Sequence, residues 1–420
     1  MRYSQAKGRL LILDDDVAVG TFMASTAARL GFEARAEARP DAFFRLIDQW
    51  SPTHIAIDLV MPEMDGVEVL VELARRKCDA RIIITSGIGG RVLEAAARSA
   101  GEHGLNLIGT LTKPFPIAAL RDVLLPAGRV TSAGATSAEP REVANGGELS
   151  GTPGIELCAR EFVHALTNHE VHLVYQPKIE CAGGRLAGFE ALARWTHPDR
   201  GLILPDQFIP FAETSGLIDA LTDEVLDQAV SWLTTQWPGM AAAAPMDSDA
   251  IGRICMSINL SAKTLSDPTF VDRVTDWCRN RDVDPARVIF ELTETSAMEN
   301  PTTSLALLTR LRMKGFQLSI DDFGTGYSSM LQLVRMPFSE LKVDKSFVMT
   351  ALKSKESRTV VKSIVDLGRS LGIKVAAEGV ENLETLDYLQ QISCDLAQGY
   401  FVGRPMQGGA VEQWMLRRAA

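Results

Sequence analysis

Short apolar runs alternate with amphipathic stretches along most of the chain, and this alternation most constrains the fold. In the first part, the runs typical of strands cover Arg9–Leu13, Glu33–Ala36, His54–Ile57, Arg81–Thr85 and Asn106–Leu111, of which Glu33–Ala36 is the weakest. Strands separated by helical segments predict parallel sheets with crossover helices, so we expect an α/β protein.

Eight further apolar runs follow in the second part of the chain. They cover Val171–Tyr175, Leu186–Phe189, Ile254–Ile258, Val288–Phe290, Gln317–Ile320, Glu340–Val343, Lys374–Ala377 and Cys394–Phe401. Eight strands match a (β/α)8 barrel, which typically has ~250 residues. A doubly wound open sheet is the competing arrangement, because counting strands does not distinguish the two. The segment Met240–Gly252 reads as a surface insertion.

The stretch between the two parts, residues 126–154, is dominated by Gly, Ala, Ser, Thr and Pro and has no apolar periodicity. This composition predicts a flexible linker. We therefore expect one domain at residues 1–125, a linker at 126–154 and a second domain at 155–420.

The bulk composition excludes several classes of protein. A formal charge of −10 argues against a broad surface for DNA or for an anionic membrane. No apolar run reaches membrane-spanning length, and the N-terminus does not read as a signal peptide. The six cysteines are scattered without a CxxC pair, which favours reduced thiols, a cytoplasmic location and no zinc cage.

In the first domain, three predicted strands end in residues that suit phosphate chemistry. Asp14-Asp15-Asp16 follows the first strand, Asp58 the third, and Thr112-Lys113 the fifth. The carboxyl ends of parallel strands meet at one edge, where clustered aspartates require a cation such as Mg2+. A carboxylate beside Mg2+ can attack a phosphoryl donor, and a lysine can pair with the product. The alternative is that the three aspartates only cap a helix.

In the second domain, a polar residue stands near the end of nearly every apolar run. The set comprises Glu190, Asn259, Glu291, Glu294, Asp321, Asp322, Lys342, Asp344, Glu378 and Gln398. Any one of them alone reads as a cap or a solvated loop residue. Together, at the single mouth of a barrel, they require cations, and oxygen ligands suit Mg2+ or Mn2+ rather than zinc.

The adjacent Asp321 and Asp322 suggest two metal ions, which ~3.5–4 Å apart would support phosphodiester cleavage. Lys342 and Asp344 share one strand face, and a simple salt bridge between them is the alternative reading. The last histidine is His197, so a Ser-His-Asp hydrolase is disfavoured and acid–base work falls to carboxylates and Lys342.

The first domain resembles response-regulator receiver domains through LLILDDD, IAIDLVMPEMDG, IIITSG and LTKPF, in that order. The resemblance implies a flavodoxin-like doubly wound fold and a sensor histidine kinase as partner. It also implies roles for individual residues: phosphorylation at Asp58, Mg2+ at Asp15 and Asp58 assisted by Asp14, a switch hydroxyl at Ser86 (with Thr85 as the second choice) and a phosphoryl-sensing Lys113. Thr110 stands where such domains often carry an aromatic switch residue.

The second domain resembles EAL domains, the cyclic-di-GMP phosphodiesterase family. The matching motifs are YQPKI, FEALARW, PDQFIPFAE, SINLSA, ELTET, DDFGTGYSS, LKVDKSF, AAEGVE and QGYF, in order. The resemblance implies a TIM-like (β/α)8 barrel with one antiparallel strand, which opens cyclic di-GMP to linear pGpG using Mg2+ or Mn2+. It also implies a homodimer or larger homo-oligomer.

The resemblance assigns a role to each matching residue. The implied metal ligands are Glu190, Asn259, Glu291 and Asp321, with Asp322 on a second ion and Asp344 assisting. Lys342 contacts the nucleophilic water, and Glu378 is either a general base or a second-metal ligand. Gln176, Arg194 and Gln398 contact or line the substrate site, and Glu294 anchors the glycine loop, Phe323–Ser329. Ala193 and Met330 are mild departures from the family pattern.

Two other functions compete with this reading. A catalytically inactive cyclic-di-GMP receptor would lack metal ligands, whereas every expected ligand is present here. Asp322-Phe323-Gly324 spells the DFG of kinases, but the HRD and VAIK motifs that a kinase needs are missing. We expect phosphorylation of the receiver to change barrel activity; the alternative is that the receiver only mediates oligomerisation.

Overall fold

The computed structural model describes residues 7–87, 90–125, 157–243, 251–298, 300–324 and 330–419. Contacts divide the described residues into two compact units, each described by itself: one contains residues 7–87 and 105–125, and the other contains residues 90–104 together with the described residues from 158 to 419. The predicted linker lies outside the described residues, as do most of the predicted insertion and positions 325–329 of the glycine loop.

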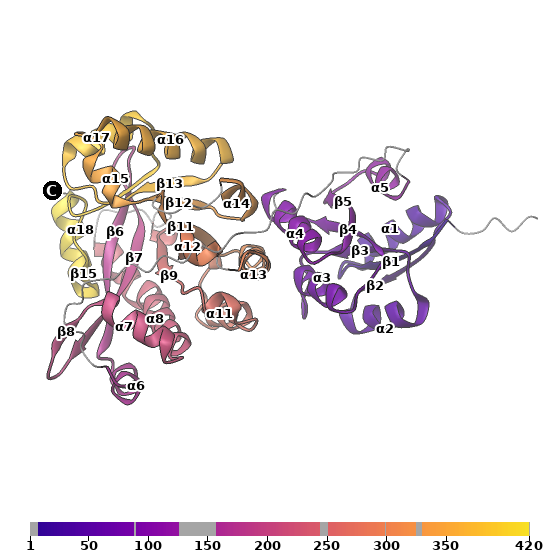
Figure 1. The fold of residues 1–420 in the computed structure, drawn as a ribbon, viewed down its shortest axis with the longest axis horizontal. Helices are drawn as coiled ribbons and strands as arrows, with labels where there is room; N and C mark the ends of the chain where they lie inside the picture. Colours follow the sequence, from indigo (N-terminus) through magenta and orange to yellow (C-terminus); the bar gives the residue numbers. More distant parts are fainter. Residues whose placement is uncertain are drawn as a thin grey trace, which may run out of the picture. The chain divides into compact units, whose positions relative to one another are not determined.

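The receiver sheet has five parallel strands in the order β2-β1-β3-β4-β5 (Figure 1). The strands are β1 (Arg9–Leu13), β2 (Glu33–Glu37), β3 (His54–Asp58), β4 (Arg81–Ser86) and β5 (Asn106–Thr112). The helices that follow these five strands in the chain are α1 (Val17–Arg29), α2 (Pro40–Trp50), α3 (Gly66–Arg75), α4 (Gly90–Glu102) and α5 (Ile117–Leu124). This strand order is that of flavodoxin-like folds, which confirms the predicted class.

Strand position explains which apolar runs were easy to recognise. The inner strand β3 is buried at every residue, so it reads as a continuous apolar run. The edge strand β2 is largely exposed and carries alternating Glu and Arg, which made it the weakest signal. Leu10, Ile12 and Ile83 of the sheet pack with Met23 of α1 and Leu120 of α5 in one core.

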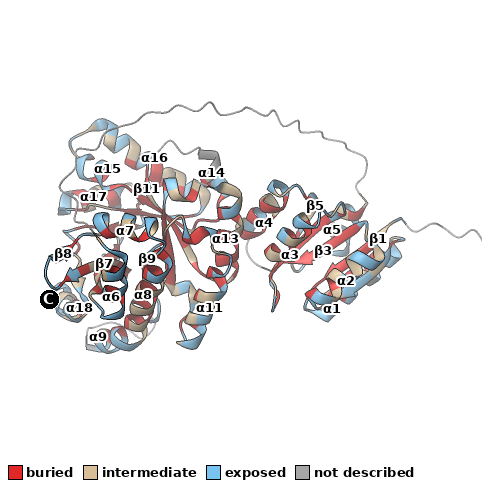
Figure 2. Cartoon of the chain, turned by 60° about the horizontal axis from the view of Figure 1, so that its bottom comes forward, coloured by how far each residue is buried: buried red, intermediate tan, exposed pale blue. Residues whose placement is uncertain are grey.

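The second unit is a closed barrel of eight strands, which excludes the open-sheet alternative. Figure 2 shows that the strands of this unit are largely buried, whereas the helices around them carry exposed residues. The barrel order is β6-β14-β13-β12-β11-β10-β9-β7, and β7 pairs with β6 to close it. Only β6 among these strands is antiparallel to both of its neighbours, as the family resemblance implied. All eight predicted runs coincide with barrel strands, and two short strands, β8 and β15, extend the sheet.

The strands of this unit are β6 (Val171–Glu180), β7 (Leu186–His197), β8 (Gly201–Ile203), β9 (Cys255–Asn259), β10 (Val288–Thr293), β11 (Gln317–Phe323), β12 (Glu340–Val343), β13 (Lys374–Ala377), β14 (Leu396–Gln398) and β15 (Met406–Gln407). Its helices are α6 (Ala159–Thr167), α7 (Pro205–Thr214), α8 (Ile218–Ser231), α9 (Trp237–Ala243), α11 (Phe270–Asn280), α12 (Glu294–Met298), α13 (Pro301–Met313), α14 (Met330–Arg335), α15 (Lys345–Thr350), α16 (Lys355–Leu371), α17 (Leu383–Gln391) and α18 (Val411–Ala419). None of the described helices combines the length and the apolar character that crossing a membrane requires.

Candidate active site and phosphoacceptor site

Lys342 stands at the centre of the barrel mouth, and its ammonium group is shared by four carboxylates. Its Nζ lies 2.6 Å from Glu291 Oε2, 2.6 Å from Glu378 Oε1, 3.2 Å from Asp321 Oδ2 and 3.6 Å from Glu190 Oε2. These residues come from strands β7, β10, β11 and β12 and from the end of β13. The described ion pairs of Lys342 are with these four acids, so the simple Lys342–Asp344 salt bridge is not the arrangement found.

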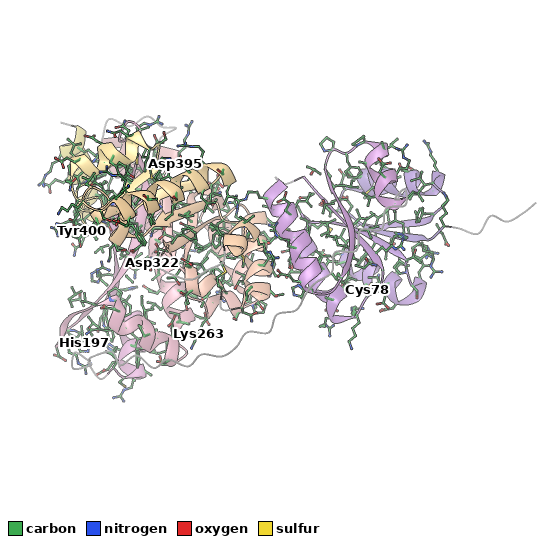
Figure 3. All side chains as sticks on the ribbon, turned by 45° about the horizontal axis from the view of Figure 1, so that its top comes forward. Cys78, His197, Lys263, Asp322, Asp395 and Tyr400 are labelled. Atoms are coloured by element: carbon green, nitrogen blue, oxygen red, sulfur yellow. The ribbon has the colours of Figure 1, made fainter. Side chains whose placement is uncertain are left out.

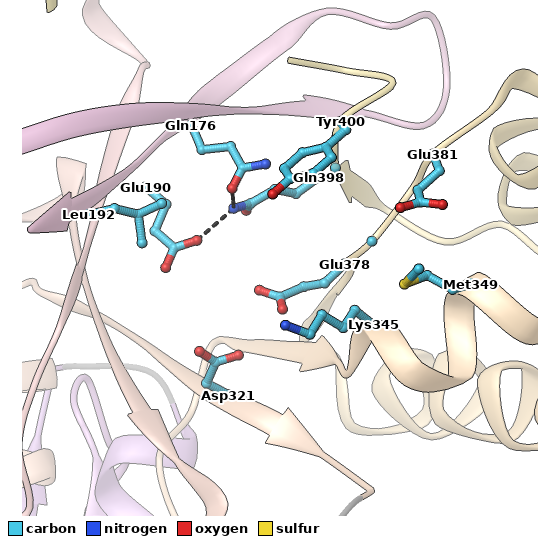
Figure 4. A pocket seen from close by; sticks show the side chains of 12 residues that line it. Gln176, Glu190, Leu192, Asp321, Lys345, Met349, Glu378, Glu381, Gln398 and Tyr400 are labelled. Atoms are coloured by element: carbon cyan, nitrogen blue, oxygen red, sulfur yellow. Dashed lines mark hydrogen bonds between the residues drawn. The ribbon is translucent and has the colours of Figure 1, made fainter. Parts of the chain in front are cut away.

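Three amide side chains surround the Glu190 carboxylate, and two of them donate hydrogen bonds to it. Asn259 Nδ2 lies 3.0 Å from Glu190 Oε1, and Gln398 Nε2 lies 2.6 Å from Glu190 Oε2. Gln398 Nε2 is also 3.2 Å from Gln176 Oε1, and Gln176 Nε2 donates to the Gly403 carbonyl at 3.2 Å. Strands β6, β7, β9 and β14 therefore hold these predicted site residues in one network. Figure 4 shows the part of it formed by Gln176, Glu190 and Gln398.

An irregularity near the end of β11 brings two adjacent aspartates to the same side. The pairing register with β12 shifts between Ile320 and Phe323, and Asp322 has a positive φ of 53°. Neighbouring strand residues normally point to opposite faces, and a bulge re-aims one of them. Oxygen atoms of Asp321, Asp322 and Glu378 consequently lie within 4.8 Å of one another. The position of Asp322 among the other side chains of this unit can be followed in Figure 3.

Burial and charge set the protonation of this cluster. Burial raises the pKa of Glu378 to about 8; Lys342 opposes this shift, and the charges of Asp321 and Glu190 add to it. Burial likewise raises the pKa values of Glu190 and Asp321. For Glu291, burial acts in the same direction, but the charges of Lys342 and Lys178 outweigh it and lower the pKa.

These shifts predict that the metal-free protein loses stability as pH rises. Folding holds a proton on Glu378 that the unfolded chain releases near pH 4.5, so the stabilisation is lost as pH rises through about 8. We expect the free energy of unfolding to fall over this range by at most about 1.4 kcal/mol per pH unit from this group. Thermal unfolding in EDTA between pH 5 and 8 measures the slope. Glu378→Gln should flatten it, and a stability that rises with pH would contradict the prediction.

Three of the four carboxylates, those of Glu190, Asp321 and Glu378, line a pocket of about 440 Å³. Figure 4 shows Glu190, Asp321 and Glu378 pointing into the same space. The pocket is lined by Gln176, Glu190, Leu192, Asp321, Lys345, Met349, Glu378, Gly379, Glu381, Gln398, Gly399 and Tyr400. Arg194 is not among these lining residues, and its Nη1 donates to the Ala193 carbonyl at 2.8 Å.

Two further predicted residues occupy structural positions beside the cluster. Glu294 is buried at the start of α12 and accepts a hydrogen bond from the Gly324 backbone N–H at 3.2 Å, which is the contact expected of a loop anchor. Asp344 caps α15 by accepting from the Ser346 N–H at 3.0 Å. In this position the Asp344 carboxylate also lies close to Asp322. Burial raises the pKa of Asp322, and the negative charge of Asp344 is the second cause.

The donor set of this mouth fits hard divalent cations. Carboxylates and amides offer only oxygen ligands, which suit Mg2+ or Mn2+. In the described part of the chain, Gln398 Oε1 is buried and accepts no hydrogen bond, and Glu291 Oε1, also without a hydrogen bond, lies 3.6 Å from the Lys178 ammonium group. Buried oxygens without donors are costly unless a cation or a ligand satisfies them.

Sequence reasoning missed the polar residues beneath the mouth, chiefly Lys178 and Glu340. Lys178 is 1% exposed on β6, and its Nζ lies 2.7 Å from Glu340 Oε1 on β12. The sequence does contain a sign of this pair. Lys178 interrupts an apolar strand, and two residues apart on a strand share a face, so Lys178 lies on the face of Gln176 and Glu340 on the face of Lys342.

The receiver strand ends form a second acidic cluster. Oxygen atoms of Asp14, Asp15 and Asp58 lie within 4.8 Å of one another. Lys113 Nζ is 2.8 Å from Asp14 Oδ2 and 2.9 Å from Asp58 Oδ2. Burial raises the pKa values of Asp14 and Asp58, while Lys113 opposes the shift. In the described residues Asp58 Oδ1 accepts no hydrogen bond, so the site suits a cation and a phosphoryl acceptor.

The residues next to this acidic cluster either cap a helix or fix the backbone at the strand ends. Asp16 caps α1 by accepting from the N–H groups of Ala18 and Val19, so the capping alternative holds for this one aspartate. Thr85 donates its hydroxyl to the Ile57 carbonyl at 3.3 Å, while Ser86 is fully buried at the end of β4. Gly66 is required where α3 begins, because a Cβ there would lie 2.4 Å from the Asp58 carbonyl oxygen.

Fold and site together define a two-domain protein with a receiver domain followed by an EAL barrel. The chain belongs to the EAL domain family, whose model matches residues 159–405. The response regulator receiver domain model matches residues 10–125.

Individual relatives support the same assignment. The chain is 32% identical over 363 residues to cyclic di-GMP phosphodiesterase RocR of Pseudomonas aeruginosa, covering 86% of each protein. It is 39% identical over 242 residues to the bifunctional diguanylate cyclase/cyclic di-GMP phosphodiesterase MucR of the same organism, and this match covers 58% of this chain and only 34% of MucR. A solved structure, "PaMucR Phosphodiesterase, c-di-GMP complex", matches 60% of this chain and 98% of its own with 38% identity and a TM-score of 0.55.

Proposed function

We propose that the barrel hydrolyses cyclic di-GMP to linear 5'-pGpG and that the receiver domain regulates this reaction. The observation that carries the proposal is the convergence of four carboxylates on Lys342, three of which (Glu190, Asp321 and Glu378) line one pocket. The relatives named for cyclic di-GMP phosphodiesterase activity, and a homologous barrel solved with c-di-GMP, support the substrate class. We also propose that the protein acts in the cytoplasm, which its six free cysteines favour.

The ligands that we assign to divalent cations are Glu190, Asn259, Glu291, Asp321 and Asp322. Two cations, Mg2+ or Mn2+, would supply an activated water and neutralise charge on the scissile phosphate. The Lys342 ammonium holds the four acids around it in place, and as the cation nearest the metal ligands it would also contact the attacking water. Glu378 can carry a proton near neutral pH, because burial raises its pKa to about 8, so it suits general acid–base work as well as metal binding.

The walls of the pocket suit a dinucleotide. Gln176 and Gln398 present amide groups beside Glu190, and Tyr400 adds a half-exposed aromatic face. An aromatic face can stack on a base. Arg194 lies outside the pocket lining, and we propose that its guanidinium binds phosphate in a bidentate manner when substrate is present. Attack of water on phosphorus breaks one bond to a ribose 3' oxygen, which leaves as a hydroxyl and opens the ring.

The direct test is pGpG release by the full chain with a metal series. We expect turnover with Mg2+ or Mn2+, and none after treatment with EDTA, restored by adding back the metal. The competing function is a cyclic-di-GMP receptor without catalysis. Dinucleotide binding with no pGpG release under any metal would favour that receptor and overturn the enzyme proposal.

The receiver proposal predicts a single phosphorylation site. With Mg2+ and acetyl phosphate as phosphodonor, we expect at most about one phosphoryl group per chain, because Asp58 is the single proposed acceptor. The product is an acyl phosphate, so the group should be lost readily by hydrolysis. Asp58→Asn should incorporate none, whereas Asp48→Asn, an exposed aspartate paired with Arg76, should behave as wild type. Mass measurement of intact protein checks both variants.

The pGpG release rate with and without phosphodonor then tests regulation. A rate change in the wild type that Asp58→Asn abolishes is the expected result, and identical rates throughout would favour a receiver that only mediates oligomerisation. A sensor histidine kinase as the natural phosphodonor and a homodimer as the working unit complete the proposal.

A further inference from the structure

A second buried lysine lies inside the barrel, in contact with one of the proposed metal ligands. Lys178 Nζ is 3.6 Å from Glu291 Oε1, whereas Lys342 Nζ is 2.6 Å from the other oxygen of that carboxylate, Oε2. Glu291, 1% exposed, is therefore held between two ammonium groups. Lys178 is buried beneath the mouth and is not among the residues that line the pocket.

Lys178 is itself fixed by groups from two other strands. Its Nζ lies 2.7 Å from Glu340 Oε1 and 3.0 Å from Ser257 Oγ. Ser319 Oγ donates to the same Glu340 oxygen at 3.2 Å. Strands β6, β9, β11 and β12 thus contribute a polar layer where TIM barrels usually pack branched apolar side chains.

Stability alone gives a weak reason for such a layer. Replacing a buried ion pair by well-packed apolar residues is often neutral or stabilising, because removing both charges from water is costly. Support of a metal-ligating carboxylate gives a stronger reason, since groups behind a ligand fix its orientation and tune its affinity for the ion.

We propose that Lys178, held by Glu340, is a positioning residue of the catalytic centre. It fixes the Glu291 carboxylate from behind, so that this ligand presents its oxygens to the metal site in one orientation. This inference rests on the proposed function for its assignment of Glu291 as a ligand. It adds a residue pair to the site that lies outside the pocket lining.

The test uses the charge-balanced double variant Lys178→Met/Glu340→Gln in the full chain. Removing one charge of each sign leaves the net charge of the site unchanged, so weaker metal binding reports lost orientation rather than altered charge. We expect the dissociation constant for Mn2+, measured by electron paramagnetic resonance without substrate, to rise about tenfold. The Mg2+ concentration for half-maximal pGpG release should rise by a similar factor.

A matched control separates positioning from loosening of the barrel. Arg310 is another buried cation of this unit, paired with Asp272 at 3.3 Å on the outer helices. Arg310→Met should lower the melting temperature while leaving the Mn2+ dissociation constant within twofold of wild type. A folded double variant with wild-type Mn2+ binding, or an equal loss of binding in Arg310→Met, would overturn the inference.

Two further outcomes are distinguishable. If the double variant does not fold, a single variant that keeps the charge of residue 340 decides. In Glu340→Asp the charge is kept but the shorter carboxylate is withdrawn from Lys178, so Mn2+ should bind more weakly, and unchanged binding overturns the inference. If the wild type binds Mn2+ but releases no pGpG, the proposed function fails while the Mn2+ comparison still judges the positioning role. A wild type that binds no Mn2+ overturns both.

Discussion

Glu190→Ala should abolish pGpG release, lowering the turnover number by at least about 10³-fold, which corresponds to several kcal/mol of lost transition-state stabilisation. Glu190 accepts hydrogen bonds from Asn259 and Gln398 and lies 3.6 Å from Lys342, so its removal leaves three neighbours without their shared acceptor. The measurement is single-turnover pGpG release at saturating Mg2+.

The control for this variant is Glu180→Ala. Glu180 ends β6 and pairs with Arg185 in a partly exposed salt bridge, so its loss should change the rate by less than about twofold. A Glu190→Ala protein that retains more than a tenth of wild-type turnover would show that Glu190 is not an essential ligand.

Lys342→Met should affect both stability and rate, because four carboxylates share this one ammonium group. Removing one partner of a buried charge network costs about 3–5 kcal/mol of folding free energy. We expect this loss in EDTA, with partial recovery on adding Mg2+, because cations that bind only the folded state stabilise it. Turnover at saturating Mg2+ should fall by about 10²-fold, since the Lys342 ammonium would no longer contact the attacking water.

Thermal unfolding with and without Mg2+, together with pGpG release, tests this prediction. Lys362→Met is the matched control, because Lys362 is an exposed lysine on α16 whose salt bridge with Asp366 lies at the surface. Wild-type stability of Lys342→Met in EDTA would contradict the central position of Lys342 in the charge network.

Several parts of the fold and site were open to prediction from local pattern. The alternation of apolar runs predicted all eight barrel strands, because a buried strand has a characteristic length and apolar composition that can be recognised in the sequence alone. Polar residues at strand ends identified the acids of both clusters, since parallel strands direct their carboxyl ends to one edge or mouth. Weakly marked elements such as β8 and β15 were not found, because strands of two or three residues carry too little periodicity.

The sequence by itself determined the two-domain plan, the α/β class and the kinds of residue that serve each site, because motif spacing and strand periodicity are local properties of the chain. Only the tertiary structure decided which charges meet. The register shift at Asp321–Asp322 brings both carboxylates beside Glu378, and Lys178 pairs with Glu340 across 162 positions of sequence. Such pairings depend on barrel closure, which brings distant strands side by side, and no local pattern encodes the resulting distances.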